Sequence, residues 1–196
     1  MQQFCLFFAQ LLHSPSRGAV IKLLTKTARR PLQAPQLTQV AAICYRRRRA
    51  SIEFLLVNTS AGKWTFPKGR LDPRLSASEA AAREALEEAG AIGRIEASHF
   101  DFYFDTKRSF GDGDVICEIQ IAAYLLEVGT LAAPHESDRN PTWFSPEEAK
   151  KRLSERRLPK YSNHLSRIID RAIAMVTQPK MDRQVAFSQR RSAMIR

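Results

Sequence analysis

The segment from Gly69 to Ala91, GRLDPRLSASEAAAREALEEAGA, constrains the structure of this chain more than any other part of the sequence. Ser76 and Glu79 have the S-x-x-E spacing of a capping box, in which two residues at the start of a helix bond to each other's backbone. Alanine, the strongest helix former, fills the middle, and Gly90 is placed to end the helix in the left-handed conformation. The sequence therefore predicts a loop followed by a helix that starts near Ser76.

Three glutamates, Glu84, Glu87 and Glu88, lie on one side of this predicted helix. At about 100° per residue they fall within about a third of the helix circumference. The arc contains no Lys or Arg, so the three carboxylates repel one another unless a cation binds between them. Hard divalent ions such as Mg²⁺ prefer oxygen ligands and commonly bridge to the phosphates of a substrate. The pattern therefore indicates a metal-dependent enzyme that acts on a phosphate compound.

An ordinary soluble helix has a similar composition, and the residues before the helix help to distinguish the two interpretations. The sequence WTFPKGR, residues 64–70, predicts a rigid aromatic-proline turn. This turn presents Lys68, Arg70 and a glycine, Gly69, that a ligand can approach closely. Basic side chains and free backbone groups beside an acidic helix suit a metal–phosphate ligand, which favours the functional interpretation.

This segment resembles the signature box of the Nudix hydrolases, G-x5-E-x7-R-E-U-x-E-E-x-G-U, in which U is a bulky or aliphatic residue. The residues that match the box are Gly69, Arg83, Glu84, Glu87, Glu88 and Gly90, with Ala85 and Ala91 at the two U positions. The W-x-F-P-K sequence before the box strengthens the resemblance. Over the rest of the chain only the pattern of strands and helices agrees.

One position departs from the box, because Leu75 stands where the family has its first glutamate. In the family that glutamate mainly braces the loop and helix. Glu79 lies one helical turn further on, and we expect it to take over the bracing. Arg83 is four residues from both Glu79 and Glu87, so we expect Arg83 to bridge these two acids and to fix the Glu87 rotamer.

The resemblance implies hydrolysis of a nucleoside diphosphate linked to another group, or of a related phosphoanhydride. It implies that Mg²⁺ or Mn²⁺ is held by Glu84, Glu87 and Glu88, with a backbone carbonyl at Lys68 or Gly69 as a further ligand. Glu84 and Glu87 are the catalytic candidates, and Glu84 either joins the metal ligands or acts as the base. Such an ion activates water and neutralises charge on the attacked phosphoryl group.

Other residues are expected to complete this site. Lys68 and Arg70 are candidates for holding the substrate phosphates outside the metal cluster. Many family members draw another acidic residue from a downstream loop, and Glu136 is the candidate here. Glu118 is the alternative, although it is equally consistent with an outward-facing residue of a strand.

The lead-in and the helix most resemble the branch that hydrolyses dinucleoside polyphosphates and diphosphoinositol polyphosphates. Residues 91–133 contain no proline, so the proline that ADP-ribose-cleaving relatives carry after the box is missing. An RNA 5′-end pyrophosphohydrolase remains an alternative, because similar lead-ins occur in that branch. A non-catalytic Nudix-like module that binds a ligand or RNA is a second alternative, and Leu75 is the residue that supports it.

The net charge of +11 is concentrated at the two ends of the chain. Residues 1–36 contain five Lys or Arg and no acid, and residues 177–196 contain five against one Asp. We therefore expect a flexible basic extension over 1–36, a Nudix domain over 37–176 and a basic tail over 177–196. The expected partner is a small phosphorylated substrate, and nucleic acid binding through the basic ends is not favoured.

The remaining sequence predicts an α+β fold, a Nudix-type α/β/α sandwich with helices on both faces of a central mixed sheet. Strands are expected at 38–45, 52–58, 100–105 and 115–128, and helices from Pro146 and over 162–176, with Arg46–Arg49 as a solvated hairpin tip. The apolar run at 4–12 is too short to span a membrane. Three cysteines without C-x-x-C spacing indicate buried free thiols in a reducing, cytoplasmic compartment.

Overall fold

The computed structural model describes residues 37–49, 51–109 and 115–178, all within the compact unit Pro35–Arg196. The expectations for the extension over 1–36 and for most of the tail over 177–196 fall outside these residues. The elements are β1 (Leu37–Arg47), β2 (Ile52–Asn58), β3 (Trp64–Thr65), β4 (Lys68–Arg70), α2 (Ala77–Ala89), β5 (Ala91–Ile95), β6 (Asp101–Ser109), β7 (Val115–Leu131), the 3₁₀ turn η1 (Ser137–Arg139), β8 (Thr142–Phe144), α3 (Pro146–Ser154) and α4 (Pro159–Thr177). None of the helices in these ranges is long and apolar enough to cross a membrane.

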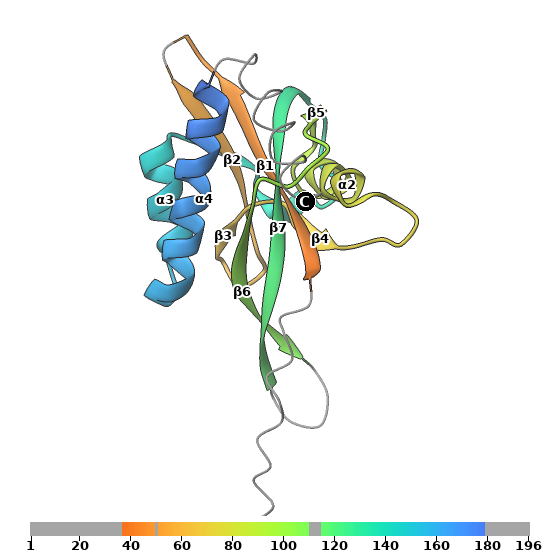
Figure 1. The fold of residues 1–196 in the computed structure, drawn as a ribbon, viewed down its shortest axis with the longest axis vertical. Helices are drawn as coiled ribbons and strands as arrows, with labels where there is room; N and C mark the ends of the chain where they lie inside the picture. Colours follow the sequence, from red (N-terminus) through yellow and green to blue (C-terminus); the bar gives the residue numbers. More distant parts are fainter. Residues whose placement is uncertain (1–36, 50, 110–114, 179–196) are drawn as a thin grey trace, which may run out of the picture. The chain divides into compact units, whose positions relative to one another are not determined.

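The strands form one eight-stranded mixed sheet with helices on both of its faces. Strand β1 pairs in parallel with β7 and antiparallel with β2 and β4, and β7 also pairs with β5 and β6. Helix α2 covers one face, and α3 and α4 cover the other (Figure 1). This is the predicted α+β sandwich, and β7 is central in the sheet, as its long apolar sequence predicts.

Strand β1 divides the core into two parts because successive side chains of a strand point to opposite faces. Val40, Ala42 and Cys44 pack on the side of α2, whereas Ala41, Ile43 and Tyr45 pack on the side of α3 and α4. All six are buried, so the strand reads as a continuous apolar run. On the second face lie the apolar residues of α4, namely Leu165, Ile168, Ile169, Ala172 and Val176. These are the residues that the helical periodicity predicts.

Helix α2 begins and ends where the sequence predicts. The Ser76 side chain accepts from the Glu79 N–H, and the Glu79 carboxylate accepts from the Ser76 N–H at 2.8 Å. Gly90 caps the other end in the left-handed conformation, with φ of 64°. The buried face differs from the simplest expectation, because Ala80 and Ala81 are buried with Ala85 and Ala89, whereas Leu86 is only half-buried. The small residues on this face let α2 lie close to the sheet.

The arginine run is only in part the solvated hairpin tip that the sequence suggests. Arg48 and Arg49 are exposed between β1 and β2, whereas Arg46 and Arg47 belong to β1 and are paired with acids. Arg46 contacts Glu53 at 2.6 Å and stacks on the Trp143 ring, and Arg47 contacts Glu127 at 3.3 Å. The sequence analysis did not predict the strands β3, β4, β5 and β8. Strands of two to five residues carry too little periodicity to be recognised.

We predict that Gly90→Ala destabilises the protein by about 1–3 kcal/mol, because a side chain strains the left-handed conformation. The new Cβ would also lie 2.0 Å from the backbone oxygen of Ala132. The free energy of unfolding, from urea titration, measures this cost. Gly129→Ala is the control, since the nearest atom to its Cβ would be the Ile92 oxygen at 3.8 Å. Equal stability of the two variants would contradict the prediction.

Candidate functional site

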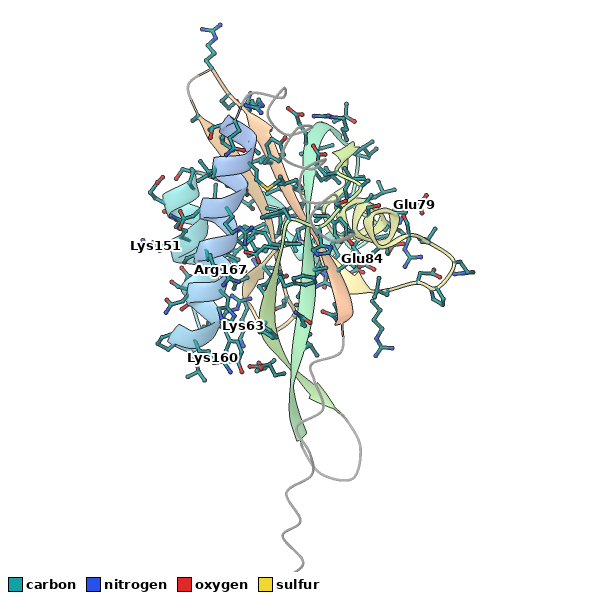
Figure 2. The ribbon with its side chains drawn as sticks, viewed as in Figure 1. Lys63, Glu79, Glu84, Lys151, Lys160 and Arg167 are labelled. Atoms are coloured by element: carbon teal, nitrogen blue, oxygen red, sulfur yellow. The ribbon has the colours of Figure 1, made fainter. Side chains whose placement is uncertain are left out.

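The site is assembled where helix α2 lies over strand β4. Gly69 is paired with Val40 of β1, whose side chain packs on the α2 side of the sheet. A Cβ atom built at Gly69 would lie 2.0–2.2 Å from the carboxyl atoms of Glu84. The Glu84 carboxyl group therefore sits against the backbone of β4, in space that any other residue at position 69 would fill. Figure 2 shows Glu84 on the side of α2 that faces the sheet, with Glu79 on the outer side.

Glu88 is the most deeply buried acid of the site, with 3% of its surface exposed. Its Oε2 accepts a hydrogen bond from the Lys68 N–H at 3.0 Å, and its Oε1 contacts Nη2 of Arg139 at 2.8 Å. Burial raises the pKa of Glu88, while the charge of Lys68 and its N–H act in the opposite direction. The pKa of Glu88 therefore reflects a balance between burial, which favours the neutral form, and Lys68 and Arg139, which favour the ionised form.

Glu136 lies beside the helix glutamates, as the sequence predicts. Its N–H donates to the backbone oxygen of Glu87 at 3.0 Å, and its Oε2 contacts Nε of Arg139 at 2.6 Å. The rival candidate, Glu118, lies elsewhere, on β7, where it contacts the Lys160 ammonium group at 2.6 Å. Glu118 is exposed and contacts α4, which agrees with the alternative that it is an outward-facing residue of a strand.

The charge of this cluster changes the protonation of Glu84. Burial raises the pKa of Glu84 to about 7, and the negative charges of Glu88 and Glu87 add to the shift. Arg83 lowers the pKa of Glu84, and Glu136 raises it slightly further. A carboxyl group with such a pKa can both accept and release a proton near neutral pH, which suits a general base.

The loop before α2 is braced by an aspartate that the sequence analysis missed. Arg83 contacts Asp72 at 2.7 Å, and it lies 3.7 Å from Glu87 and 3.9 Å from Glu84. The predicted bridge from Arg83 to Glu79 is absent from the described structure, because Glu79 is engaged in the capping box. Glu79 therefore braces only the first turn of the helix, through its bonds to Ser76.

Leu75 takes a different part in holding this loop. It is half-buried and packs against the apolar core on the α2 side of the sheet. The loop is thus fixed by the Asp72–Arg83 ion pair and by an apolar contact, where the family box has a glutamate. Asp72 precedes a proline in the sequence LDPR, residues 71–74. Because aspartate is common in turns, this pattern could have identified Asp72 from the sequence.

The two cations predicted to bind phosphate occupy different environments. Burial lowers the pKa of Lys68, while the charges of Glu88 and Asp105 raise it, so its ammonium group belongs to the acidic cluster. Arg70 is exposed at the end of β4. The structure adds Arg139, which the sequence analysis missed. Its signal was weak, since an arginine three residues after Glu136 is ordinary in a polar loop.

The acids of the site are ligands of the type that a hard divalent cation prefers, although the described side chains do not form a ready cage. Among residues 37–49, 51–109 and 115–178, no group of three or more His, Cys, Asp or Glu is arranged to hold a metal ion. The carboxyl groups of Glu84, Glu87, Glu88 and Glu136 nevertheless belong to one electrostatic cluster. Burial is the main cause that raises the pKa of Glu84, and repulsion from Glu88 and Glu87 adds to it. A dication relieves such repulsion.

Comparison with known proteins gives a family match over most of the described region. The sequence model of the NUDIX domain matches residues 37–164. Nudix hydrolase 4 of Arabidopsis thaliana is 33% identical over 100 residues, which cover 50% of this chain and 46% of that protein. The chain spans about half the length of the curated relatives that it matches first.

Solved structures share the fold at low sequence identity. A Caenorhabditis elegans Ap4A hydrolase in a binary complex gives a TM-score of 0.52 at 22% identity, covering 72% of this chain and 98% of that one. The NUDIX domain of Shewanella oneidensis NrtR, complexed with ADP ribose, gives a TM-score of 0.52 at 18% identity. That match covers 80% of this chain and 98% of the other. These matches agree on the architecture of the sheet and helices.

We predict that Asp72→Asn speeds amide hydrogen exchange in residues 70–76, because Arg74 and Arg83 lose the charged acid that both contact. The melting temperature changes little, since the pair lies near the surface. Exchange measured by mass spectrometry on the metal-free protein tests this. The control is Asp170→Asn, which removes the partner of Lys150 on the opposite face. Exchange at 70–76 that is the same in both variants would show that Asp72 does not brace the loop.

Proposed function

This chain belongs to the NUDIX domain family, and we propose that it is a divalent-metal-dependent hydrolase of phosphoanhydride bonds. The favoured substrates are dinucleoside polyphosphates or diphosphoinositol polyphosphates. The observation that carries the proposal is the acidic cluster of Glu84, Glu87, Glu88 and Glu136 beside Lys68. A cluster of carboxylates next to a cation suits a metal ion that is bridged to phosphate.

In the proposed reaction the residues of the site bind the metal ion, accept a proton or contact the phosphates. Mg²⁺ or Mn²⁺, held by Glu84, Glu87, Glu88 and the Gly69 carbonyl, would supply charge neutralisation at the attacked phosphoryl group and a more acidic water. Glu84 accepts a proton at its carboxylate, and its contact with Gly69 fixes the position of that carboxylate. Lys68 provides positive charge for the phosphates.

The choice of a long phosphate chain rests on the cations around the cluster. Lys68 and Arg139 lie at the acidic cluster and Arg70 is exposed at the end of β4, so each additional phosphate gives one of them a partner. The C. elegans structural neighbour is named an Ap4A hydrolase, which agrees with this substrate class. Hydrolysis of an RNA 5′ end and a non-catalytic binding role are the competing proposals. We also propose a cytoplasmic location.

We predict that Glu84→Gln lowers kcat by about 10²–10⁴-fold, because the variant loses its proton acceptor. Its melting temperature does not fall, since the substitution removes like-charge repulsion with Glu87 and Glu88. Phosphate release from diadenosine tetraphosphate with Mg²⁺ measures the activity. Glu147→Gln, an exposed glutamate of α3, is the control. Normal turnover of Glu84→Gln would refute the role of this residue.

We predict that kcat/KM is higher for diadenosine tetra- or pentaphosphate, or a diphosphoinositol polyphosphate, than for ADP-ribose or a triphosphorylated RNA 5′ end. A substrate panel assayed with and without Mg²⁺ provides the ranking. Arg70→Gln should weaken the longest substrates most, because they alone reach beyond Lys68. Lys151→Gln, on the exposed face of α3, is the control (Figure 2). Faster cleavage of ADP-ribose than of every polyphosphate would overturn the ranking, and absence of turnover would favour the binding role.

A further inference from the structure

Arg139 occupies a position on Glu88 that a bound dication would have to share. We propose that Arg139 is an internal counter-ion of Glu88, and that a divalent cation displaces it on entering the site. This inference rests on the proposed metal dependence. It assigns to Arg139 a positioning role, in which the arginine holds the Glu88 carboxylate and lowers the affinity of the metal-free protein for the cation.

The contacts of Glu88 carry this inference. One carboxyl oxygen accepts from the Lys68 N–H, and the other contacts Nη2 of Arg139 at 2.8 Å. Glu88 is 3% exposed, so its carboxylate meets these two partners rather than bulk water. A dication bound at the same oxygen would lie beside a positive charge at contact distance, and this repulsion opposes binding. Either the arginine leaves Glu88 or the cation binds weakly.

The surrounding loop allows the side chain to leave without unfolding. The loop is anchored through its backbone, by the Ala132 N–H to Gly90 oxygen bond at 2.8 Å and the Glu136 N–H to Glu87 oxygen bond at 3.0 Å. These two bonds are independent of the Arg139 side chain. That side chain is 22% exposed, so it is not enclosed by the core. A change of its rotamer can therefore release Glu88 while the backbone bonds of the loop stay in place.

Charge balance explains why a counter-ion is present. Glu88 carries the burial penalty of an ionised group, and the charges of Lys68 and Arg139 oppose this penalty. The arginine contacts Glu136 as well, at 2.6 Å, so it neutralises two acids of the cluster at once. A bound dication performs the same neutralisation. After exchange, the guanidinium carries a free positive charge beside the position that the proposed function assigns to phosphate.

The test is Mn²⁺ binding without substrate, measured by electron paramagnetic resonance and calorimetry on the full chain. We expect Arg139→Gln to bind Mn²⁺ about tenfold more tightly than the wild type, and Arg139→Lys to lie between them. The metal-free Arg139→Gln protein should melt at a lower temperature, because Glu88 loses a buried partner. Arg94→Gln, which removes an arginine from Glu127, should leave the affinity unchanged.

Equal or weaker Mn²⁺ binding by Arg139→Gln would overturn the inference, because an arginine that only supports the loop cannot oppose the metal. If neither protein binds Mn²⁺, both this inference and the proposed metal dependence fail. If the wild type binds Mn²⁺ and the two Arg139 variants bind it with the same affinity, only the inference fails.

A second measurement uses the unmodified protein, in case Arg139→Gln does not fold. The Nε–H resonance of Arg139, assigned through Arg139→Lys, should move on addition of Mg²⁺ and exchange faster with solvent. An Arg139 resonance unchanged at a Mg²⁺ concentration that saturates the site would overturn the inference.

Discussion

The repulsion among acids confined between helix α2 and strand β4 is the constraint on which the site depends. Glu84 fits because Gly69 has no side chain, and Glu88 is held by the Lys68 N–H and by Arg139. Small alanines on the same sheet-facing side of the helix, Ala80 and Ala81 among them, let α2 approach the sheet closely enough to bury these acids. A larger residue on either surface would move the carboxylates toward water and weaken their effect on one another.

The sheet provides the rigid support that this arrangement needs. Strand β1 is buried on both faces, and it pairs with β4 along one edge and with β7 along the other. Because β4 is short, its position depends on β1 rather than on its own length. The acids on α2 therefore face a backbone whose location is fixed by a two-sided core. The loop that carries Glu136 and Arg139 is then placed by its hydrogen bonds to the end of the same helix.

Much of the helix could be predicted from sequence, because caps and periodicity are local properties. The capping box at Ser76, the end at Gly90 and the buried face of α4 follow from residues within one or two turns. The short strands could not be predicted, since their hydrogen bonds come from distant segments. The brace at Arg83 was assigned to the wrong acid, because Glu79 has the right helical spacing, whereas Asp72 reaches Arg83 only through the fold of the loop.

The sequence by itself determined which acids share a helix face, because this follows from the angle between successive residues of a helix. It also identified Gly69 as a position of close approach, but the fold decided that the Glu84 carboxyl group occupies the space beside it. Only the tertiary structure decided that Glu136 joins the cluster while Glu118 does not, and that Arg139 contacts Glu88. These partners are separated by tens of residues, so their contacts depend on how the sheet and helices pack rather than on any local pattern.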